Sequence, residues 1–246
     1  MQNIFFSIII PTLNEENYIE NIISSLEKQT YKNFEVIIVD NGSKDRTVEI
    51  IKKIQKKSLL KIILVFCKQR GISYARNYGV KYTKGEFLVF FDTDGYVPKN
   101  WLLRANNIFL NNNNIKLLGG IVIFLSKKSI FHTITFNIHC FFGFLCVLLF
   151  HIFSGNSFHI DGHNMTIRKE NFIKAGGFPN IICEDIGFTQ KMLNMYKKRN
   201  SIKLTPYLLV YYSARTFEKN GYIKTLIEQL RDYKHKTNPK YYKIYR

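Results

Sequence analysis

Short apolar runs alternate with helix-like segments as far as residue 95, and this alternation constrains the fold more than any other feature. Four runs suit strands that are buried on both faces, at residues 5–10, 35–39, 61–66 and 87–91. Three segments between them are predicted to be helices, at residues 15–29, 45–56 and 72–83. The chain is therefore predicted to form an α/β fold, with a mainly parallel central sheet flanked by helices.

Polar residues follow three of these strands at the point where each strand ends. The first strand is followed by Pro-Thr-Leu-Asn-Glu at 11–15, the second by Asp40, and the fourth by Asp92 and Asp94. Ligands of open α/β sheets bind in the crevice outside the carboxyl ends of the strands. Asp and Asn are also ordinary turn residues. The combination of acids at one edge is what predicts a ligand site.

Asp92 and Asp94 place two carboxylates near one point at the mouth of the predicted sheet. Carboxylates suit Mg²⁺ or Mn²⁺, which bind one or two of them and complete their coordination with substrate phosphates. A metal held there would offset the charge that builds on a departing diphosphate. The alternative is a turn whose first Asp caps the next helix.

The second half of the chain departs from the alternation. Strands are expected at 116–125 and 202–212, and helices at 184–198 and 218–234. Residues 129–160 contain no Asp, Glu, Lys or Arg. Because no repeat or long linker divides the sequence, we predict a single domain over residues 1–246.

The net charge of +18 indicates an anionic partner. Nucleic acid, an acidic lipid surface and phosphorylated substrates all fit this charge, and a Lys-rich surface without a partner is the alternative. The four cysteines form no C-x-x-C pair, which favours reduced thiols. The first residues lack a basic region and a cleavage site, so we predict a strand there and not a signal peptide. A cytoplasmic location is the expectation.

Four segments, in their order and spacing, resemble the family 2 glycosyltransferases of GT-A fold. They are SIIIPTLNEE at 7–16, VIIVDNGSKDRT at 36–47, RGISYARNYG at 70–79 and FFDTDG at 90–95. The sequence GGFP at 176–179, followed by Glu184 and Asp185, resembles the acceptor-side motif of that family. The resemblance implies an inverting, metal-dependent transferase that uses a UDP- or GDP-sugar. It divides the domain into a nucleotide-binding half at 1–115 and an acceptor-binding half at 116–246.

The resemblance also implies a donor site at matching positions of this sequence. Pro11, Leu13 and Glu15 would line the nucleoside pocket, and Asp40 would contact the base or the ribose. Many relatives carry an aromatic residue at the position of Leu13. Asp94 would be a metal ligand, together with Asp92, which would bind the ribose or the metal.

Several cations are expected near the nucleotide. The resemblance places Arg76 and Asn77 where relatives position the nucleotide, and Arg70 is a second cationic candidate for the phosphates. Arg215 is a candidate to close over the diphosphate, because a guanidinium matches phosphate geometry. A surface ion pair is the alternative for Arg76, and an ordinary surface arginine after a strand is the alternative for Arg215.

On the acceptor side, the resemblance implies that Asp185 is the catalytic base and that Glu184 makes a supporting acceptor contact. Acids at a helix N-terminus also interact favourably with the helix dipole, which is the structural alternative. An acceptor phosphate is already an anion, so Asp185 would then orient the acceptor and not deprotonate it. His163 is expected to line the acceptor side.

The uncharged stretch is long enough to span a bilayer. A span would place Asp92 and Asp94 on one side of the membrane and Asp185 on the other, although one reaction needs them all. We therefore predict interfacial helices over 129–153, drawn to anionic headgroups by Lys127 and Lys128. A buried helix, against the sheet or a dimer partner, is the alternative. The expectation is a peripheral protein at the cytoplasmic face, acting on a lipid phosphate or a lipid-linked glycan.

Other classes of protein explain the sequence less well. A basic nucleic-acid-binding protein would account for the charge, but the acids at the strand ends would repel phosphates, so no nucleic acid is expected. A dinucleotide-dependent oxidoreductase would need a G-x-G-x-x-G turn after the first strand, and residues 11–14 do not provide it. A non-catalytic relative would not need the three acids Asp92, Asp94 and Asp185.

Overall fold

The computed structural model describes residues 3–126, 128–131, 133–134, 137–138, 160–181, 183–196, 201–221 and 224. The predicted alternation of the first half is confirmed. Its elements are β1 (Phe6–Thr12), α1 (Ile19–Glu27), β2 (Phe34–Asp40), α2 (Thr47–Lys57), β3 (Ile62–Phe66), α3 (Ile72–Val80) and β4 (Phe87–Phe91). The later elements are β5 (Gly95–Tyr96), α4 (Trp101–Asn111), β6 (Leu117–Leu125), β7 (Asn164–Arg168), α6 (Lys169–Lys174), α7 (Glu184–Met195), β8 (Ile202–Ser213) and α8 (Arg215–Asn220).

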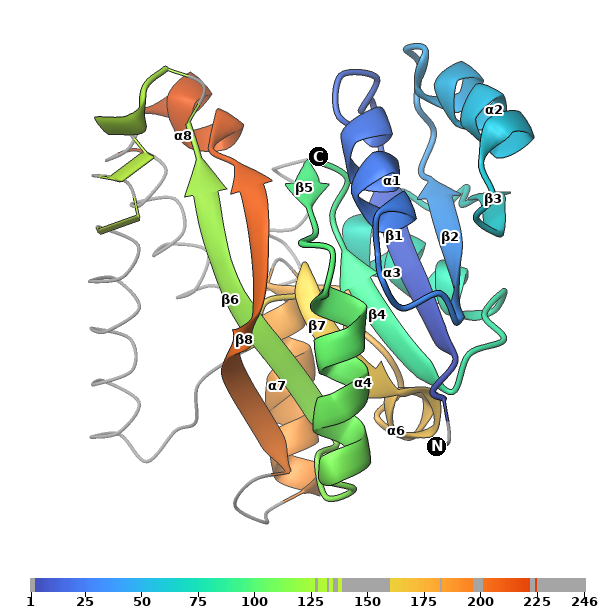
Figure 1. Cartoon of the computed structure of the whole chain (residues 1–246), viewed down its shortest axis with the longest axis vertical. Coiled ribbons are helices and arrows are strands. Elements are labelled where there is room, and N and C mark those ends of the chain that lie inside the picture. The colour runs from blue at the N-terminus through green and yellow to red at the C-terminus, as the bar shows by residue number, and fades with distance from the viewer. Residues whose placement is uncertain are drawn as a thin grey trace.

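The described strands form one sheet in the order β3-β2-β1-β4-β7-β6-β8-β5. β1, β2, β3 and β4 are parallel to their neighbours in this group, and β6 is parallel to β8. β7 runs antiparallel to both β4 and β6, and the short β5 runs antiparallel to β8. The sheet is therefore mainly parallel, as predicted, with the antiparallel β7 joining the two halves of the chain (Figure 1).

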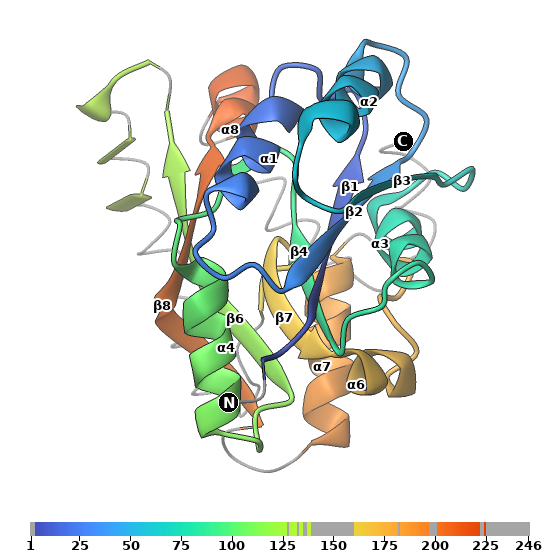
Figure 2. The same ribbon diagram turned by 45° about the vertical axis from the view of Figure 1, so that its right-hand side comes forward.

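Helices cover both faces of the sheet, and the strands alternate their side chains between the two cores. Ile8 and Ile10 of β1 pack in one core with apolar residues of α1, α2 and α4. Ile9 packs in the other core with apolar residues of α3, α6 and α7. Figures 1 and 2 show α1, α2 and α4 on one side of the sheet and α3, α6 and α7 on the other. Continuous apolar runs are thus explained by strands that are buried on both faces.

The strand ends of the first half meet at one edge of the sheet. Thr12 at the end of β1 pairs with Asp40 at the end of β2, and Asp40 pairs with Phe66 at the end of β3. β4 lies on the other side of β1 and ends at Phe91, directly before Asp92. The polar segments that follow β1, β2 and β4 therefore emerge side by side.

The second half differs from the sequence prediction at several elements. The helix expected at 218–234 begins earlier, as α8, and most of that range lies outside the described residues. α7 ends at Met195, and residues 197–198 of the helix expected at 184–198 also lie outside them. α4, β7 and α6 were not predicted. No helix in the described part of the chain is both long and apolar enough to cross a membrane.

Candidate active site

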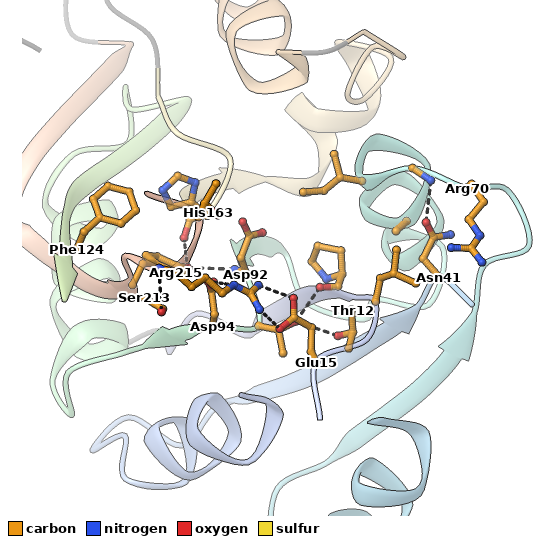
Figure 3. A pocket seen from close by; sticks show the side chains of 18 of the residues that line it. Thr12, Glu15, Asn41, Arg70, Asp92, Asp94, Phe124, His163, Ser213 and Arg215 are labelled. Atoms are coloured by element: carbon orange, nitrogen blue, oxygen red, sulfur yellow. Dashed lines mark hydrogen bonds and ion pairs between the residues drawn. The ribbon is translucent and has the colours of Figure 1, made fainter. Parts of the chain in front are cut away.

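A cavity of about 750 Å³ opens at the edge of the sheet where β1, β2 and β4 end. Its walls come from both halves of the chain, because residues of β6, β8 and α8 face the loops after β1 and β4 (Figure 3). Eight of the predicted site residues line it: Pro11, Leu13, Glu15, Arg70, Asp92, Asp94, His163 and Arg215. The predicted convergence of acids and cations at one sheet edge is therefore present for these side chains.

Thr93 fixes the loop that carries the two acids. This residue is buried, and its Oγ1 donates a hydrogen bond of 2.9 Å to the carbonyl of Pro11. The same Oγ1 lies 3.2 Å from Oγ1 of Thr12. The loop after β4 is thus tied to the end of β1 through its middle residue. Asp92 and Asp94, on either side of it, both line the cavity.

Arg215 holds two acids of the cavity at once. Its Nη1 and Nη2 donate to the two carboxylate oxygens of Glu15, at 2.7 and 2.5 Å. Its Nε lies 3.0 Å from Oδ2 of Asp94. Figure 3 shows the guanidinium between these two carboxylates. The planar fork of arginine suits this paired arrangement. Arg215, which begins α8, therefore connects the end of β8 to the loops after β1 and β4.

Asp94 is short of compensating positive charge. Burial raises the pKa of its carboxyl to about 6, and the charges of Asp92 and Glu15 add to this rise. The guanidinium of Arg215 acts in the opposite direction but does not cancel it. Ionised Asp94 would consequently be stabilised by a further cation in the cavity.

Arg76 forms a second cluster behind the cavity. Its side chain is buried, with Nη1 donating to Oε1 of Glu184 at 2.5 Å and Nη2 to Oδ1 of Asp92 at 2.8 Å. The guanidinium thereby joins the Asp-Thr-Asp loop after β4 to the first residue of α7. Arg76 does not line the cavity, although it was expected beside the nucleotide. Its observed contacts are those of a residue that positions other side chains.

Gly162 leaves the space that this cluster needs. A Cβ on Gly162 would lie 2.4 Å from Nη1 of Arg76 and 3.2 Å from Cβ of Asp185. The guanidinium is held at both ends, so it cannot withdraw without losing a carboxylate. Glycine is therefore required here for close packing.

Glu184 and Asp185 begin α7 and have different surroundings. Burial raises the pKa of Glu184 to about 7, while the charge of Arg76 opposes the rise. Asp185 is half-buried, and its two carboxylate oxygens accept hydrogen bonds from the backbone N–H groups of Gly162 and Ile186, at 3.1 and 2.8 Å. Neither acid lines the cavity, and Asp185 lies beside Gly162, which directly precedes the cavity residue His163. The bond from Ile186 also stabilises the start of the helix.

Tyr212 is a site residue that the sequence did not reveal. Its hydroxyl donates to the carbonyl of His163 at 2.6 Å and accepts from the backbone N–H of Asp92 at 3.0 Å. The rings of Tyr212 and His163 meet edge to face, with centroids 4.8 Å apart. Burial raises the pKa of Tyr212 well above its usual range, so the phenol stays protonated. Tyr212 lies near the end of β8, and in the sequence it is simply the last residue of a predicted strand, so no signal marked it as a site residue.

Asp40 shapes its own loop. Its carboxylate accepts hydrogen bonds from the backbone N–H groups of Gly42 and Ser43, at distances of 3.0 to 3.3 Å. The side chain is buried and does not line the cavity. Arg70 does line it, and its Nη2 donates to the carbonyl of Gly42 at 3.3 Å. Asp40 and Arg70 thus both support the turn after β2.

Asn41, which was not predicted, joins two loops of the nucleotide-binding half. Its Oδ1 accepts from the N–H of Gly71 at 2.7 Å, and its Nδ2 donates to the carbonyls of Cys67 and Gln69. Asn41 lines the cavity together with Gly71 and Arg70. Figure 3 shows this pair of loops at the end of the cavity opposite Phe124.

Asn77 lies away from the cavity and anchors the Gly-Gly-Phe-Pro segment. Its amide exchanges two hydrogen bonds with the backbone of Phe178, accepting at 2.9 Å and donating at 2.8 Å. Gly177 has a φ of +66°, and a Cβ there would lie 2.6 Å from Oδ1 of Asn77. Asn77 therefore connects α3 to the turn before α7. Both of its polar groups are already used there.

Most of the predicted interfacial segment at 129–153 lies outside the described residues, which include only 129–131, 133–134 and 137–138 of it. The prediction for the remainder of that range stays untested. The described residues follow β6 directly.

Comparison with known proteins gives consistent results along the chain. The family model described as glycosyl transferase family 2 matches residues 7–176. An uncharacterized glycosyltransferase of Haemophilus influenzae is 30% identical over 193 residues, which are 78% of this chain and 73% of that protein. The poly(ribitol-phosphate) beta-N-acetylglucosaminyltransferase TarS of Staphylococcus aureus is 39% identical over 102 residues, which are 41% of this chain. That match covers 18% of TarS, so this chain corresponds to a small part of its length.

Solved structures share the fold. The mannosyltransferase PcManGT from Pyrobaculum calidifontis, in complex with GDP-Man and Mn²⁺, matches with a TM-score of 0.64 and 18% identity, over 94% of this chain and 65% of that chain. Residues 1–349 of S. aureus TarS, in complex with UDP-GlcNAc, match with a TM-score of 0.60 and 22% identity, over 86% of this chain and 59% of that chain. The predicted GT-A-like α/β fold is therefore confirmed.

Proposed function

The chain belongs to glycosyl transferase family 2, and from this premise we propose that it is an inverting, metal-dependent glycosyltransferase. It transfers a sugar from a nucleotide-diphosphate sugar to a membrane-associated acceptor, a lipid phosphate or a lipid-linked glycan. The observation that carries the proposal is the cavity at the strand ends, where Glu15, Asp92 and Asp94 face the cations Arg70 and Arg215. Such a site has both the acids for a divalent metal and the cations for a diphosphate.

The donor fits along the length of the cavity. Arg70 lies toward one end and Arg215 toward the other (Figure 3), and either guanidinium would exchange its present partners for a charged diphosphate. Leu13 is 38% exposed beside them and offers an apolar surface to the base. The names of the two structural relatives include GDP-Man and UDP-GlcNAc, which supports a UDP- or GDP-sugar as donor.

Asp92 and Asp94 are the residues that would hold Mg²⁺ or Mn²⁺. The described part of the chain has no cluster of three or more His, Cys, Asp or Glu that could hold a metal, so phosphate oxygens would complete the coordination. The raised pKa of Asp94 fits this role, because a cation would stabilise its ionised form. Bound there, the metal supplies positive charge to the departing diphosphate.

Asp185 is the proposed base. In an inverting transfer the acceptor hydroxyl attacks the anomeric carbon from the face opposite the diphosphate, and the bond from that carbon to the diphosphate breaks. The hydroxyl proton passes to a carboxylate within hydrogen-bond reach. The backbone N–H groups of Gly162 and Ile186 hold the Asp185 carboxylate in one orientation, next to His163 of the cavity wall. With a phosphate acceptor, Asp185 orients the acceptor and removes no proton.

The acceptor side would lie at β6 and β8, beside the segment of Gly162 and His163 that contacts the start of α7. His163 lines the cavity there, and Glu184 supports the acceptor through its position beside Asp185. The name of the relative TarS specifies a poly(ribitol-phosphate) acceptor, which supports a phosphate-containing acceptor for this chain. The uncharged stretch at 129–160 supports an acceptor at the cytoplasmic face of a membrane.

A panel of UDP- and GDP-sugars, each with Mn²⁺ or Mg²⁺, tests the proposal. We expect one nucleotide class to raise the Tm and to release nucleoside diphosphate, and Asp94→Asn to reduce that release at least about a hundredfold. Glu49→Gln is the matched control, because Glu49 is exposed on α2, pairs with Lys53 and does not line the cavity; this variant should behave as wild type. If no nucleotide sugar stabilises the protein, or if Asp94→Asn releases diphosphate normally, the proposal is wrong.

A further inference from the structure

A short helical segment after β6 has its polar and apolar sides reversed. All of the described residues between 130 and 138 are helical. Asn137 turns toward the protein, where its amide donates to the carbonyl of Phe124 at 2.7 Å and accepts from the N–H of the same residue at 3.0 Å. Thr133, one turn earlier, accepts from the N–H of Ser126 at 3.0 Å. The polar side of this segment is thus its inner side.

The outer side is apolar. Ile130, Phe131, Ile134 and Ile138 are 76%, 69%, 52% and 49% exposed, and together they form what we call the outer apolar face. Three of them follow at four-residue spacing, so they lie on one side of the helix. A helix at a protein–water boundary normally turns its apolar stripe inward. The reverse arrangement suits a helix whose outer surroundings are hydrocarbon.

The charges of nearby residues indicate which partner would cover the outer apolar face. Lys128 is exposed immediately before it, and Lys219 and Lys224 are exposed on α8 and just beyond. Ser126 donates to Glu218 at 2.5 Å, which joins the start of the segment to α8. The whole chain carries a net charge of +18, so a second copy would be repelled while anionic headgroups would be attracted.

The outer apolar face is connected to the cavity through Phe124. Phe124, which Asn137 holds by two hydrogen bonds, lines the cavity and packs edge to face against Phe217 of α8. From these observations we propose that the outer apolar face inserts into an anionic lipid bilayer and brings the cavity to the membrane surface. The inference deepens the proposed function, but binding to vesicles requires no turnover, so the two are tested separately.

Sedimentation with vesicles tests the docking directly. We expect the protein to bind phosphatidylglycerol vesicles more strongly than phosphatidylcholine vesicles, and Phe131→Ser with Ile134→Ser to weaken binding about tenfold or more. Leu59→Ser with Ile173→Ser is the matched control, because these two side chains are exposed elsewhere on the protein. The control should bind as wild type does. Equal binding by the Phe131/Ile134 variant and wild type, at equal Tm, would overturn the proposal.

A spectroscopic variant keeps the test independent of folding defects. The single tryptophan, Trp101, is 1% exposed and gives a constant background. In Phe131→Trp, we expect the added emission to shift to the blue when phosphatidylglycerol vesicles are added, and to be quenched by brominated acyl chains. An unshifted emission would show that the face stays in water. A shift caused by raising the protein concentration without lipid would identify a second copy as the occupant, and would also overturn the proposal.

Discussion

Two arginines of the site each join two carboxylates, but their surroundings differ. The side chain of Arg76 is 2% exposed, and it connects Asp92 to Glu184 inside the fold. The side chain of Arg215 is 36% exposed, and it connects Glu15 to Asp94 at the wall of the cavity. The same charge pattern is therefore built once in the interior and once where a ligand can reach it.

This difference separates a structural role from a ligand-binding role. A buried ion pair that loses one partner leaves an uncompensated charge in the interior, whereas a partly exposed pair that opens is compensated by water. Arg76 therefore fixes the distance between the donor loop and α7. Arg215 can exchange its carboxylates for a diphosphate, because any cation that enters at Asp94 replaces its charge there.

The largest effect is expected for Arg76→Leu. Removing the guanidinium leaves Asp92 and Glu184 without their shared partner, and we expect a loss of about 3–5 kcal/mol in the free energy of unfolding. Denaturant unfolding measures this loss. Arg76→Lys keeps the charge but cannot bridge both acids, and should recover part of the stability. If the free energy of unfolding of Arg76→Leu equals that of wild type, Arg76 does not have the structural role that distinguishes it from Arg215.

These pairings also mark how far the sequence alone could lead. The strands and the acids at their ends were predictable, because apolar runs and the Asp-Thr-Asp spacing are local patterns. The pairings were not, since Arg76 is separated from Glu184 by 108 positions and Arg215 from Glu15 by 200. Only the fold brings such residues together, and no local pattern shows whether an arginine faces a ligand or another side chain.

The sequence also did not show whether a polar residue binds a ligand or forms hydrogen bonds to the protein backbone. Asp40 and Asn77 were predicted beside the nucleotide, and in the structure their polar atoms serve backbone groups of nearby turns. Tyr212 supports the site from near the end of β8, where the sequence shows only a strand pattern. Likewise, α4 was not predicted, although its buried residues Trp101, Leu102, Ala105 and Phe109 have helical spacing in the sequence.

An intermediate effect is expected for Arg215→Gln. The side chain of Arg215 is 36% exposed, but those of Glu15 and Asp94 are only 13% and 15% exposed, so the free energy of unfolding should fall by about 1–2 kcal/mol, less than in Arg76→Leu. Nucleoside diphosphate release should nevertheless fall about 10- to 100-fold, because a charge-assisted hydrogen bond to the diphosphate is lost. Steady-state kinetics and unfolding on the same samples separate the two quantities. A variant that is as destabilised as Arg76→Leu would mean that both arginines are structural.

Arg46→Gln serves as the control for that measurement. Arg46 pairs with Glu16 near the same end of the sheet, and its side chain is 75% exposed. It does not line the cavity. The change removes a guanidinium and leaves the cavity intact, so both stability and nucleotide release should stay close to wild type.

The smallest effect concerns the charge state inside the buried cluster. Burial raises the pKa of Glu184 from its ordinary 4.5 to about 7, against the attraction of Arg76. A carboxyl that binds its proton more tightly when folded stabilises the protein below pH 4.5, and this contribution is lost as the pH rises to about 7. In Glu184→Gln the side chain at this position is uncharged at every pH. The Tm of wild type should therefore fall relative to that of the variant as the pH rises through this range.

The direction of that change decides how the buried arginine works. Glu49→Gln is the comparison, because it breaks an exposed pair with Lys53. Since the pKa of Glu49 is lowered, this carboxyl stays ionised above its ordinary pKa. The difference in Tm between Glu49→Gln and wild type should therefore stay constant over the same pH range. The raised pKa of Glu184 would be contradicted if the Tm difference between Glu184→Gln and wild type also stayed constant with pH. It would also be contradicted if the Tm of wild type rose relative to that of the variant as the pH increased. The attraction of Arg76 would then outweigh burial and would hold Glu184 ionised. The ion pair of the buried Arg76 with Glu184 would then persist at neutral pH without contact with solvent, in contrast to the partly exposed Arg215.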